Sequence, residues 1–191
     1  GGVEDGGGGK SLDSLKPTRI KDPAGDEFLA EWTGEGGGAA DYARQKAAGE
    51  KWANGAKNPG IDAVYQDTQK KLADAGIKQV TAYRGIRLPE DHPLLADVRT
   101  GKVKVGDTVE INGSSFASWS GSADAATTYA QKAAASLSGE KGKHVGLVLE
   151  RVVDAKDIVS GHGLHEGFIP DEREVLARSR GTQKLRLRAI H

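Results

Sequence analysis

The sequence predicts an α+β fold, with helices in the first part of the chain and strands in the second. Apolar residues recur at helical spacing from Ile61 to Leu72, and Gly76 follows as a helix stop. Beyond Gly76 the apolar period shortens to that of strands, interrupted by one Ala-rich helix over residues 123–137. Because helices and strands are segregated along the chain, the order favours α+β over a repeated βαβ plan.

Two further helices are predicted before Gly76. Residues 26–32 begin a short helix, and residues 39–53 form an Ala-rich one. The turn Asn58-Pro59-Gly60 then separates the second helix from the third. Ser122 is placed to cap the later helix over residues 123–137.

Strands are predicted where aliphatic residues cluster between glycines or polar turns. They cover residues 80–84 (ending at Gly85), 103–105, 108–111, 145–153, 172–177 and 184–190. In the last of these, Leu185 and Leu187 alternate with Arg186 and Arg188, which is typical of a strand with one buried face. Residues 161–170 are predicted to form a loop.

Length and composition indicate a single domain with an N-terminal arm. The chain has 191 residues, enough to bury a core without staples. Its glycine-rich start predicts a flexible linker or arm over residues 1–25, followed by one catalytic domain over residues 26–191. Residues 26–78 of that domain should be mainly helical, and residues 79–191 mainly β with one helix. There is no cysteine, so disulfides and cysteine-based nucleophiles or metal sites are excluded.

The charge balance argues against partners that are recognised by bulk charge. The 27 basic side chains equal the 27 acidic ones, so no global field attracts nucleic acid or an anionic membrane. No apolar run approaches the length that spans a bilayer. The glycine-rich start suits either a processed fragment or the C-terminal domain of a larger modular protein.

A pair of glutamates is the first candidate for chemistry. If residues 172–177 are extended, Glu172 and Glu174 point to the same face, about 6–7 Å apart. Two carboxylates on one face suit cleavage of a glycosidic bond, whose transition state carries positive charge on the sugar. A Glu-x-Glu pair also occurs on ordinary solvated strands, so the pair alone leaves both interpretations open.

Arg84 and Ser118 are candidates for supporting roles. The guanidinium of Arg84 can grip a pyrophosphate bidentately, and Gly85 beside it lets a ligand approach the backbone. Ser118 lies in a polar stretch before a helix and can hold either the arginine or the glutamate by hydrogen bonds. An ordinary surface arginine and a serine-rich capping loop are the plain alternatives.

Taken together, these segments resemble a known enzyme class. Tyr83-Arg84-Gly85, the Phe-x-Ser-x-Ser pattern at 116–120 and the Glu-x-Glu-Val-Leu pattern at 172–176 occur in this order. The ordered triple resembles the arginine-serine-glutamate class of mono-ADP-ribosyltransferases, which includes the clostridial binary toxins. Trp119 stands where the serine motif of that class usually has threonine. The resemblance covers residues 61–191.

The resemblance implies a fold and a division of labour. Two packed, mostly antiparallel sheets would surround an NAD cleft, with helices at the N-terminal side. Arg84 would bind the phosphates and ribose of NAD, and the Gly85 backbone would meet the nicotinamide carboxamide. Ser118 would support the site, Glu174 would engage the ribose 2′-hydroxyl, and Glu172 would align the acceptor. The resemblance also implies that NAD would be the substrate and that no metal would be needed.

Two further features depend on the same resemblance. Tyr129 falls where the family often has an aromatic that stacks on nicotinamide; a core-facing tyrosine is the equal alternative. The loop over residues 160–171 would recognise the acceptor protein, and Phe168 and Ile169 either contact that partner or return to the core. The pair His162 and His165 lacks a third ligand of suitable spacing, so it is interpreted as loop polar groups and not as a metal site.

The resulting hypothesis is a transferase that cleaves NAD and transfers ADP-ribose to an arginine of a target protein. It would be a toxin domain of a secreted bacterial effector acting in the target cell's cytoplasm, or a phage-borne modifier. A cognate immunity protein is a further expected partner, and a membrane is not; a nucleic-acid acceptor is disfavoured but remains open. The alternatives are an NAD glycohydrolase and a catalytically silent structural or binding module on the same fold.

Overall fold

The computed structural model describes residues 11–138 and 144–191, so the glycine-rich residues 1–10 of the predicted linker lie outside the described part. The helices are α1 (Pro23–Thr33), α2 (Ala39–Ala53), α3 (Pro59–Ala75), α4 (Pro93–Arg99) and α5 (Ala123–Ser138). The strands are β1 (Gln79–Pro89), β2 (Thr108–Ile111), β3 (Phe116–Ser120), β4 (His144–Asp154), β5 (Ile158–Gly161), β6 (Glu174–Arg178) and β7 (Gln183–Ile190).

The strands form one antiparallel sheet of seven in the order β2-β7-β4-β1-β3-β6-β5, which confirms the α+β class. Two packed sheets were expected, and the structure joins them into one through a narrow contact. The only register pair between β1 and β3 within the described residues is Tyr83 with Ser120. The sheet therefore has two halves, β2-β7-β4-β1 and β3-β6-β5, which separate on either side of this pair.

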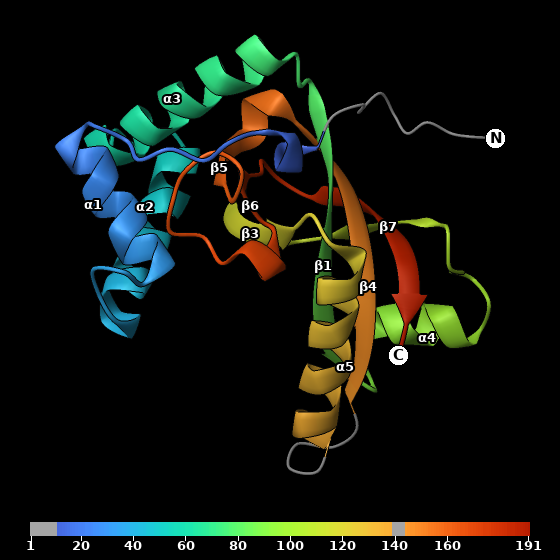
Figure 1. Cartoon of the computed structure of the whole chain (residues 1–191). Coiled ribbons are helices and arrows are strands. Elements are labelled where there is room, and N and C mark those ends of the chain that lie inside the picture. The colour runs from blue at the N-terminus through green and yellow to red at the C-terminus, as the bar shows by residue number, and fades with distance from the viewer. Residues whose placement is uncertain (1–10, 139–143) are drawn as a thin grey trace.

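The helices lie in two groups around this sheet (Figure 1). Helices α1, α2 and α3 gather beside the β3-β6-β5 half, where Phe28, Ile61 and Val64 form a core with Phe116 and Leu176. Helix α5 runs along β1 and β4 and packs Ala126 and Ala130 against Val148. A third and larger core fills the remaining face of the sheet. The two halves are thus covered by different helices.

The helix boundaries follow from local capping. Asn58 accepts a hydrogen bond from the Ile61 amide at 3.0 Å at the start of α3, and Gly76 ends that helix with φ of 70°. Ser122 Oγ accepts from the Ala125 amide at 3.1 Å, as the capping prediction required. The predicted helices at 26–32, 39–53 and 123–137 are all confirmed.

Several strand predictions need correction. β1 does not end at Gly85 but continues to Pro89, because β4 pairs with it along its whole length. Residues 103–105 are not a strand; they belong to a turn in which the Asp107 carboxylate accepts from the Lys104 amide at 2.9 Å. Helix α4, of seven residues, and β5, of four, were not predicted; α4 is too short to display a helical period, and β5 is buried at all four positions and so shows no alternation.

The glycine at position 85 is required by packing. A Cβ atom there would lie 2.2 Å from the Ala126 carbonyl oxygen of α5, and one at Gly146 would lie 2.6 Å from that of Ala130. Glycines on the two neighbouring strands therefore let α5 approach the sheet. This steric reason by itself requires glycine at position 85; that Gly85 also lets a ligand approach the backbone stays a prediction.

Part of the segment predicted as an arm packs onto the domain. Leu12 is buried, and Thr18 forms a parallel bridge with His165. Asp13 accepts from His162 and lies 3.6 Å from Arg173. Residues from Ser11 onward thus contact the loop that precedes β6, and ordered structure begins before the predicted boundary at residue 25.

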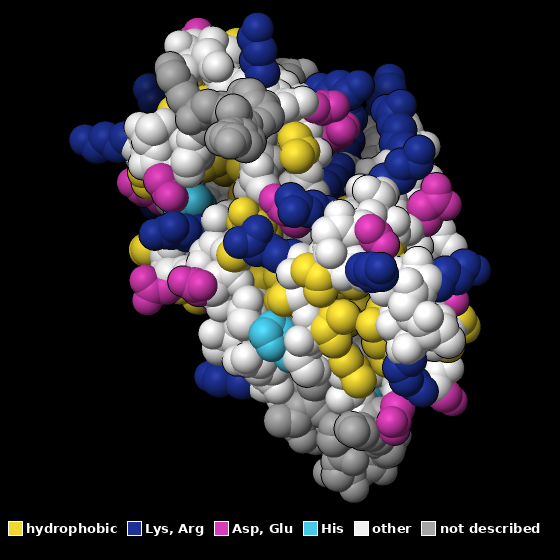
Figure 2. All heavy atoms as spheres, turned by 90° about the vertical axis from the view of Figure 1, so that its right-hand side faces the viewer, with side chains coloured by type: hydrophobic (Ala, Val, Ile, Leu, Met, Phe, Trp, Pro, Cys, Tyr) yellow, Lys and Arg dark blue, Asp and Glu magenta, His cyan; other side chains and the backbone are white. Residues whose placement is uncertain are grey.

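The face that carries α4 and β7 shows apolar side chains between groups of charged ones (Figure 2). Leu88, Leu94 and Val98 are partly buried against the third and largest core, and Val105 is exposed.

No helix among the described residues is long and apolar enough to traverse a bilayer.

Replacing Gly85 with alanine should destabilise the fold, because the new methyl group overlaps the α5 backbone. We expect a loss of about 1–3 kcal/mol in the free energy of unfolding, as for other overpacked cores. Chemical denaturation measures it. Gly38→Ala is the control, since a Cβ atom there meets nothing within 4 Å; an equal loss in both variants would contradict the packing argument.

Candidate active site

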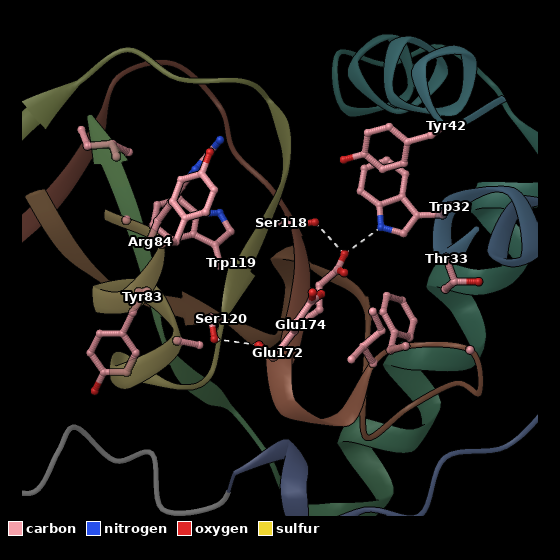
Figure 3. Close-up of a pocket in the computed structure, with 18 of the residues that line it drawn as sticks. Trp32, Thr33, Tyr42, Tyr83, Arg84, Ser118, Trp119, Ser120, Glu172 and Glu174 are labelled. Atoms are coloured by element: carbon pink, nitrogen blue, oxygen red, sulfur yellow. Dashed lines mark hydrogen bonds between the residues drawn. The ribbon is translucent and has the colours of Figure 1, made fainter. Parts of the chain in front are cut away.

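The predicted site residues converge on one cavity of about 800 Å³. It is lined by the six candidates and by helical and loop residues that the sequence did not point to (Figure 3). The candidates are Arg84, Gly85, Ser118, Tyr129, Glu172 and Glu174. They come from β1, β3, α5, the 3₁₀ turn that precedes β6 and the start of β6. Segments up to ninety positions apart in the sequence therefore line the same cavity.

The cavity exists because the sheet opens beside it. After the pair Tyr83 and Ser120, β1 has no further β3 partner, although β4 still holds its other edge. Arg84 to Arg87 on one strand and Ser118 and Trp119 on the other then line the space between the halves. An open edge presents backbone groups as well as side chains to a ligand. Arg84 is thus in mid-strand, yet beside an opening.

Glu174 is the most constrained of these side chains. Its Oε2 atom accepts hydrogen bonds from Ser118 Oγ at 2.6 Å and from Trp32 Nε1 at 2.7 Å (Figure 3). Burial raises the pKa of the Glu174 carboxyl, the two donors oppose that rise, and the charge of Glu172 adds to it. The sequence left open whether Ser118 holds Arg84 or Glu174. In the structure Ser118 holds Glu174.

The wall opposite Arg84 is aromatic and comes from the N-terminal helices. Trp32 of α1 packs edge-on against Phe116 at 5.3 Å and lies 4.7 Å from the Tyr42 ring of α2. Burial raises the pKa of Tyr42, the Glu174 charge adds to the rise, and Arg84 counters it. Tyr42 therefore faces both charged residues of the cleft.

Arg84 is held by a neighbouring indole. Its guanidinium lies over the Trp119 ring, 5.8 Å from the centroid, and no carboxylate in the described part of the chain pairs with it. A cation stacked on a buried aromatic is oriented without being neutralised. Trp119, which departs from the usual threonine of the resembled motif, is the residue that supplies this contact.

Glu172 does not lie on a strand, so the predicted alternation with Glu174 is wrong. It ends a 3₁₀ turn (Pro170–Glu172), and Arg173 adopts a left-handed conformation with φ of 45° before β6 begins. Such a conformation costs a non-glycine residue about 1–2 kcal/mol. Ser120 Oγ donates to the Glu172 carbonyl at 2.7 Å and holds the turn, so Glu172 still lines the cavity.

Tyr129 lies at the cavity and not in the core. It is 54% exposed, which excludes the core-facing alternative. Its hydroxyl accepts from Arg87 Nη1 at 3.2 Å. Arg87, three residues after Arg84 on β1, therefore adds a second cation to this side of the cleft, one that the sequence did not single out.

The two apolar residues of the loop before β6 have different surroundings. Phe168 packs into the core with the N-terminal helices, whereas Ile169 is 56% exposed at the cavity rim. His165 is buried and lies between Ser160 Oγ and Asp67 Oδ2, each at 2.7 Å, so it fastens the loop to α3. Within residues 11–138 and 144–191, no group of three or more metal-ligating side chains occurs.

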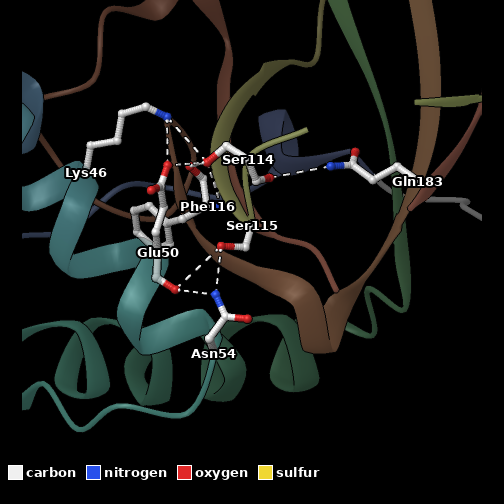
Figure 4. A network of polar contacts seen from close by, with 7 residues as sticks. All are labelled: Lys46, Glu50, Asn54, Ser114, Ser115, Phe116 and Gln183. Carbon is white, nitrogen blue, oxygen red and sulfur yellow. Dashed lines mark hydrogen bonds and ion pairs between the residues drawn. The ribbon is translucent and has the colours of Figure 1, made fainter. Parts of the chain in front are cut away.

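A polar network fixes the beginning of β3, and with it Ser118 (Figure 4). Ser114 Oγ donates to the Glu50 carboxylate at 2.7 Å, and Asn54 of α2 donates to Ser115 Oγ at 3.2 Å. From the other side, Gln183 of β7 donates to the Ser114 carbonyl at 3.4 Å. Helix α2 and both sheet halves are thereby joined at the strand that carries Ser118.

Comparisons with protein-family models, curated proteins and solved structures gave no match. The interpretation of the site therefore depends on the residues themselves. They offer a buried carboxylate with two donors, a second carboxylate nearby, two guanidinium groups across the cleft, and aromatic walls.

The buried Glu174 carboxylate should lower stability at neutral pH. Because its folded-state pKa lies above the ordinary value of 4.5, ionisation opposes folding above that pH, and the penalty disappears as pH falls below it. Glu174→Gln should therefore raise the melting temperature at pH 8, by about 2–4 °C per kcal/mol gained. The gain should vanish toward pH 4.5; a variant that melts lower at pH 8 would contradict this account.

Proposed function

We propose that this protein is a mono-ADP-ribosyltransferase that cleaves NAD at the nicotinamide ribose and transfers ADP-ribose to an arginine of a target protein. The observation that carries the proposal is the convergence of Arg84, Ser118, Glu172 and Glu174 on one cavity from three separate segments of the chain. The same four residues, in the same order, carry the resemblance to the arginine-serine-glutamate class. An open sheet edge and aromatic walls supply the room for a dinucleotide.

Glu174 is the residue proposed to act on the glycosidic bond. Loss of nicotinamide leaves positive charge on the ribose ring, and a fixed carboxylate beside the ring stabilises that charge in a site shielded from water. Trp32 and Ser118 hold one oxygen of Glu174, which leaves the other free for the ribose 2′-hydroxyl. Both donors favour the charged form, and they oppose the rise in the pKa of Glu174 that burial causes.

The opposite wall is proposed to bind the rest of NAD. Arg84 has no carboxylate partner among the described residues, and Arg87 lies on the same strand. Guanidinium groups bind pyrophosphate oxygens bidentately, so this pair suits the diphosphate. Tyr129 and Tyr42 offer exposed ring faces for nicotinamide or adenine.

Glu172 is proposed to orient the acceptor. An arginine nucleophile is protonated in water and needs a carboxylate to bind it and to take its proton. Glu172 sits on a turn at the cavity, next to the exposed Ile169, where a partner protein can reach it. We further propose action as a delivered toxin domain or phage-borne modifier, with a target protein and a cognate immunity protein as partners. Water in place of the arginine would give the alternative, an NAD glycohydrolase.

The direct test is incubation of the protein with biotinylated NAD and cell lysate. We expect release of nicotinamide and a labelled protein whose modified residue, identified by mass spectrometry, is an arginine. Glu174→Gln should reduce both signals by about 100-fold or more, as for loss of other charge-stabilising groups. Nicotinamide release without a labelled protein would favour the glycohydrolase, and no release would refute both.

Trp32 should contribute to nicotinamide release through its N–H group and not only through its ring. Trp32→Phe keeps an aromatic wall but removes one donor from Glu174, so the pKa of Glu174 should rise further. The acid limb of the pH profile of nicotinamide release should then move to higher pH, with about a tenfold lower rate at neutral pH.

Trp52→Phe is the matched control for this substitution. The Trp52 indole donates to Asp62 Oδ1 at 2.7 Å, away from the cavity, so the variant loses an equivalent bond elsewhere. Its pH profile should match that of the unmodified protein. Equal shifts in both variants would show that Trp32 acts only through stability.

Substitution of Glu172 should impair the transfer of ADP-ribose and the cleavage of NAD to different extents. Glu172→Gln should impair transfer to arginine by at least about tenfold more than NAD hydrolysis, because it touches the acceptor and not the ribose. Nicotinamide release and label incorporation are measured in the same reaction. Parallel losses of both would refute the division of labour.

A further inference from the structure

A second cavity lies where β4 leads into the turn at Ala155–Asp157 and β6 leads into β7. Its volume is about 380 Å³. Five of its lining side chains are cations and one is a carboxylate, Asp157. The cations are Arg151, Lys156, Arg178, Arg180 and Lys184. A chain with balanced overall charge thus concentrates positive charge at this place.

Most of this charge lacks a counterion. Arg178 pairs with Asp157 at 3.4 Å and also donates to Tyr65 and to the Lys156 carbonyl. Within the described residues, the other four cations have no carboxylate at ion-pair distance. Like charges held close together repel unless an anion lies between them. The cations that line the cavity therefore outnumber its one lining carboxylate, and a bound anion would offset this excess of positive charge.

Arg151 is fixed at the cavity wall by neutral acceptors. Its Nη1 atom donates to Ser179 Oγ at 2.8 Å, and its Nη2 atom donates to the Arg178 carbonyl at 2.9 Å. Its guanidinium lies over the Trp119 ring at 5.3 Å, and burial lowers the pKa of Arg151. A guanidinium has five N–H donors, so several remain without a partner in the part of the chain described.

We propose that this cavity binds a compact anion that carries phosphate groups. A preset guanidinium with free donors, flanked by lysines, is the arrangement that binds phosphate oxygens. The volume lies within the range of about 300–1,000 Å³ found for small-ligand sites. None of the described lining residues is aromatic, so the phosphate groups and not a base would carry recognition.

This site is separate from the proposed NAD cleft, and its existence does not depend on the proposed function. Arg84 lines the first cavity and Arg151 the second, and both guanidinium groups lie over the same indole. Trp119 lines the first cavity only, but its ring contacts one arginine from each cavity. An anion that binds Arg151 should change the electrostatic surroundings of the Trp119 indole. Tryptophan emission is therefore a second readout of binding.

The test is a titration of the full chain with inorganic pyrophosphate, without NAD, followed by calorimetry and tryptophan fluorescence at constant ionic strength. The informative variant is Lys156→Gln/Arg180→Gln, because both side chains are exposed and their loss should not disturb folding. We expect its affinity to fall by about tenfold or more, the effect of about one lost charge-assisted contact. The matched control, Lys51→Gln with Lys132→Gln, removes the same charge from exposed helix positions and should bind normally.

Arg84→Ala distinguishes the two cavities. It should retain pyrophosphate binding, because Arg84 does not line the second cavity. No binding by the unmodified protein, equal weakening by the control pair, or a loss confined to Arg84→Ala would each overturn the proposal. Because the titration contains no NAD, failure of the proposed transferase activity would leave its outcome unaffected.

Discussion

The pair of hydrogen bonds that hold Glu174 is the constraint on which the rest of the site depends. One donor, Ser118, comes from the neighbouring strand, and the other, Trp32, comes from a helix 142 residues earlier in the chain. Both donors favour the ionised form of this carboxyl and oppose the rise in its pKa that burial causes. Helix α1, β3 and β6 must therefore meet at one point for Glu174 to receive both hydrogen bonds.

Much of the remaining architecture brings those three elements together. The network around Ser114 ties β3 to α2, and Ser120 ties it to the turn before β6. Glycines at positions 85 and 146 let α5 press against the sheet beside the cleft. The narrow junction between the sheet halves then leaves an opening where the charged residues meet. A carboxyl whose pKa is raised by burial weakens the fold when it ionises, so we expect Glu174 to lower stability above its ordinary pKa.

The sequence predicted the regular elements better than the way they meet. The Ala-rich helix at 39–53 and the strand around 145–153 were predictable because composition and period agree there. The turn at Glu172 was not, because Arg173 adopts a left-handed conformation without the glycine that would indicate one. Trp32 and Tyr42 were missed for another reason: their place beside Glu174 depends on packing between distant segments, which no local pattern encodes.

The six candidate residues of the cleft did follow from ordered short motifs, even where the local geometry around them was wrong. Glu172 lines the cavity from a turn and not from a strand, and Arg84 lies in mid-strand and not at an end. The motifs identified the residues, whereas the predicted geometry depended on where each strand begins and ends, and both of these boundaries were wrong. The residue that departs from the motif, Trp119, has its own structural role as the ring beneath two arginines.

The central claim is that one cleft holds a dinucleotide between Arg84 and Glu174. A crystal structure of the Glu174→Gln variant with NAD tests it most directly, because that variant should bind NAD without consuming it. The account predicts the diphosphate at Arg84 and the nicotinamide ribose within hydrogen-bond distance of residue 174. NAD bound elsewhere, or in the reverse orientation with the adenosine ribose at residue 174, would contradict it.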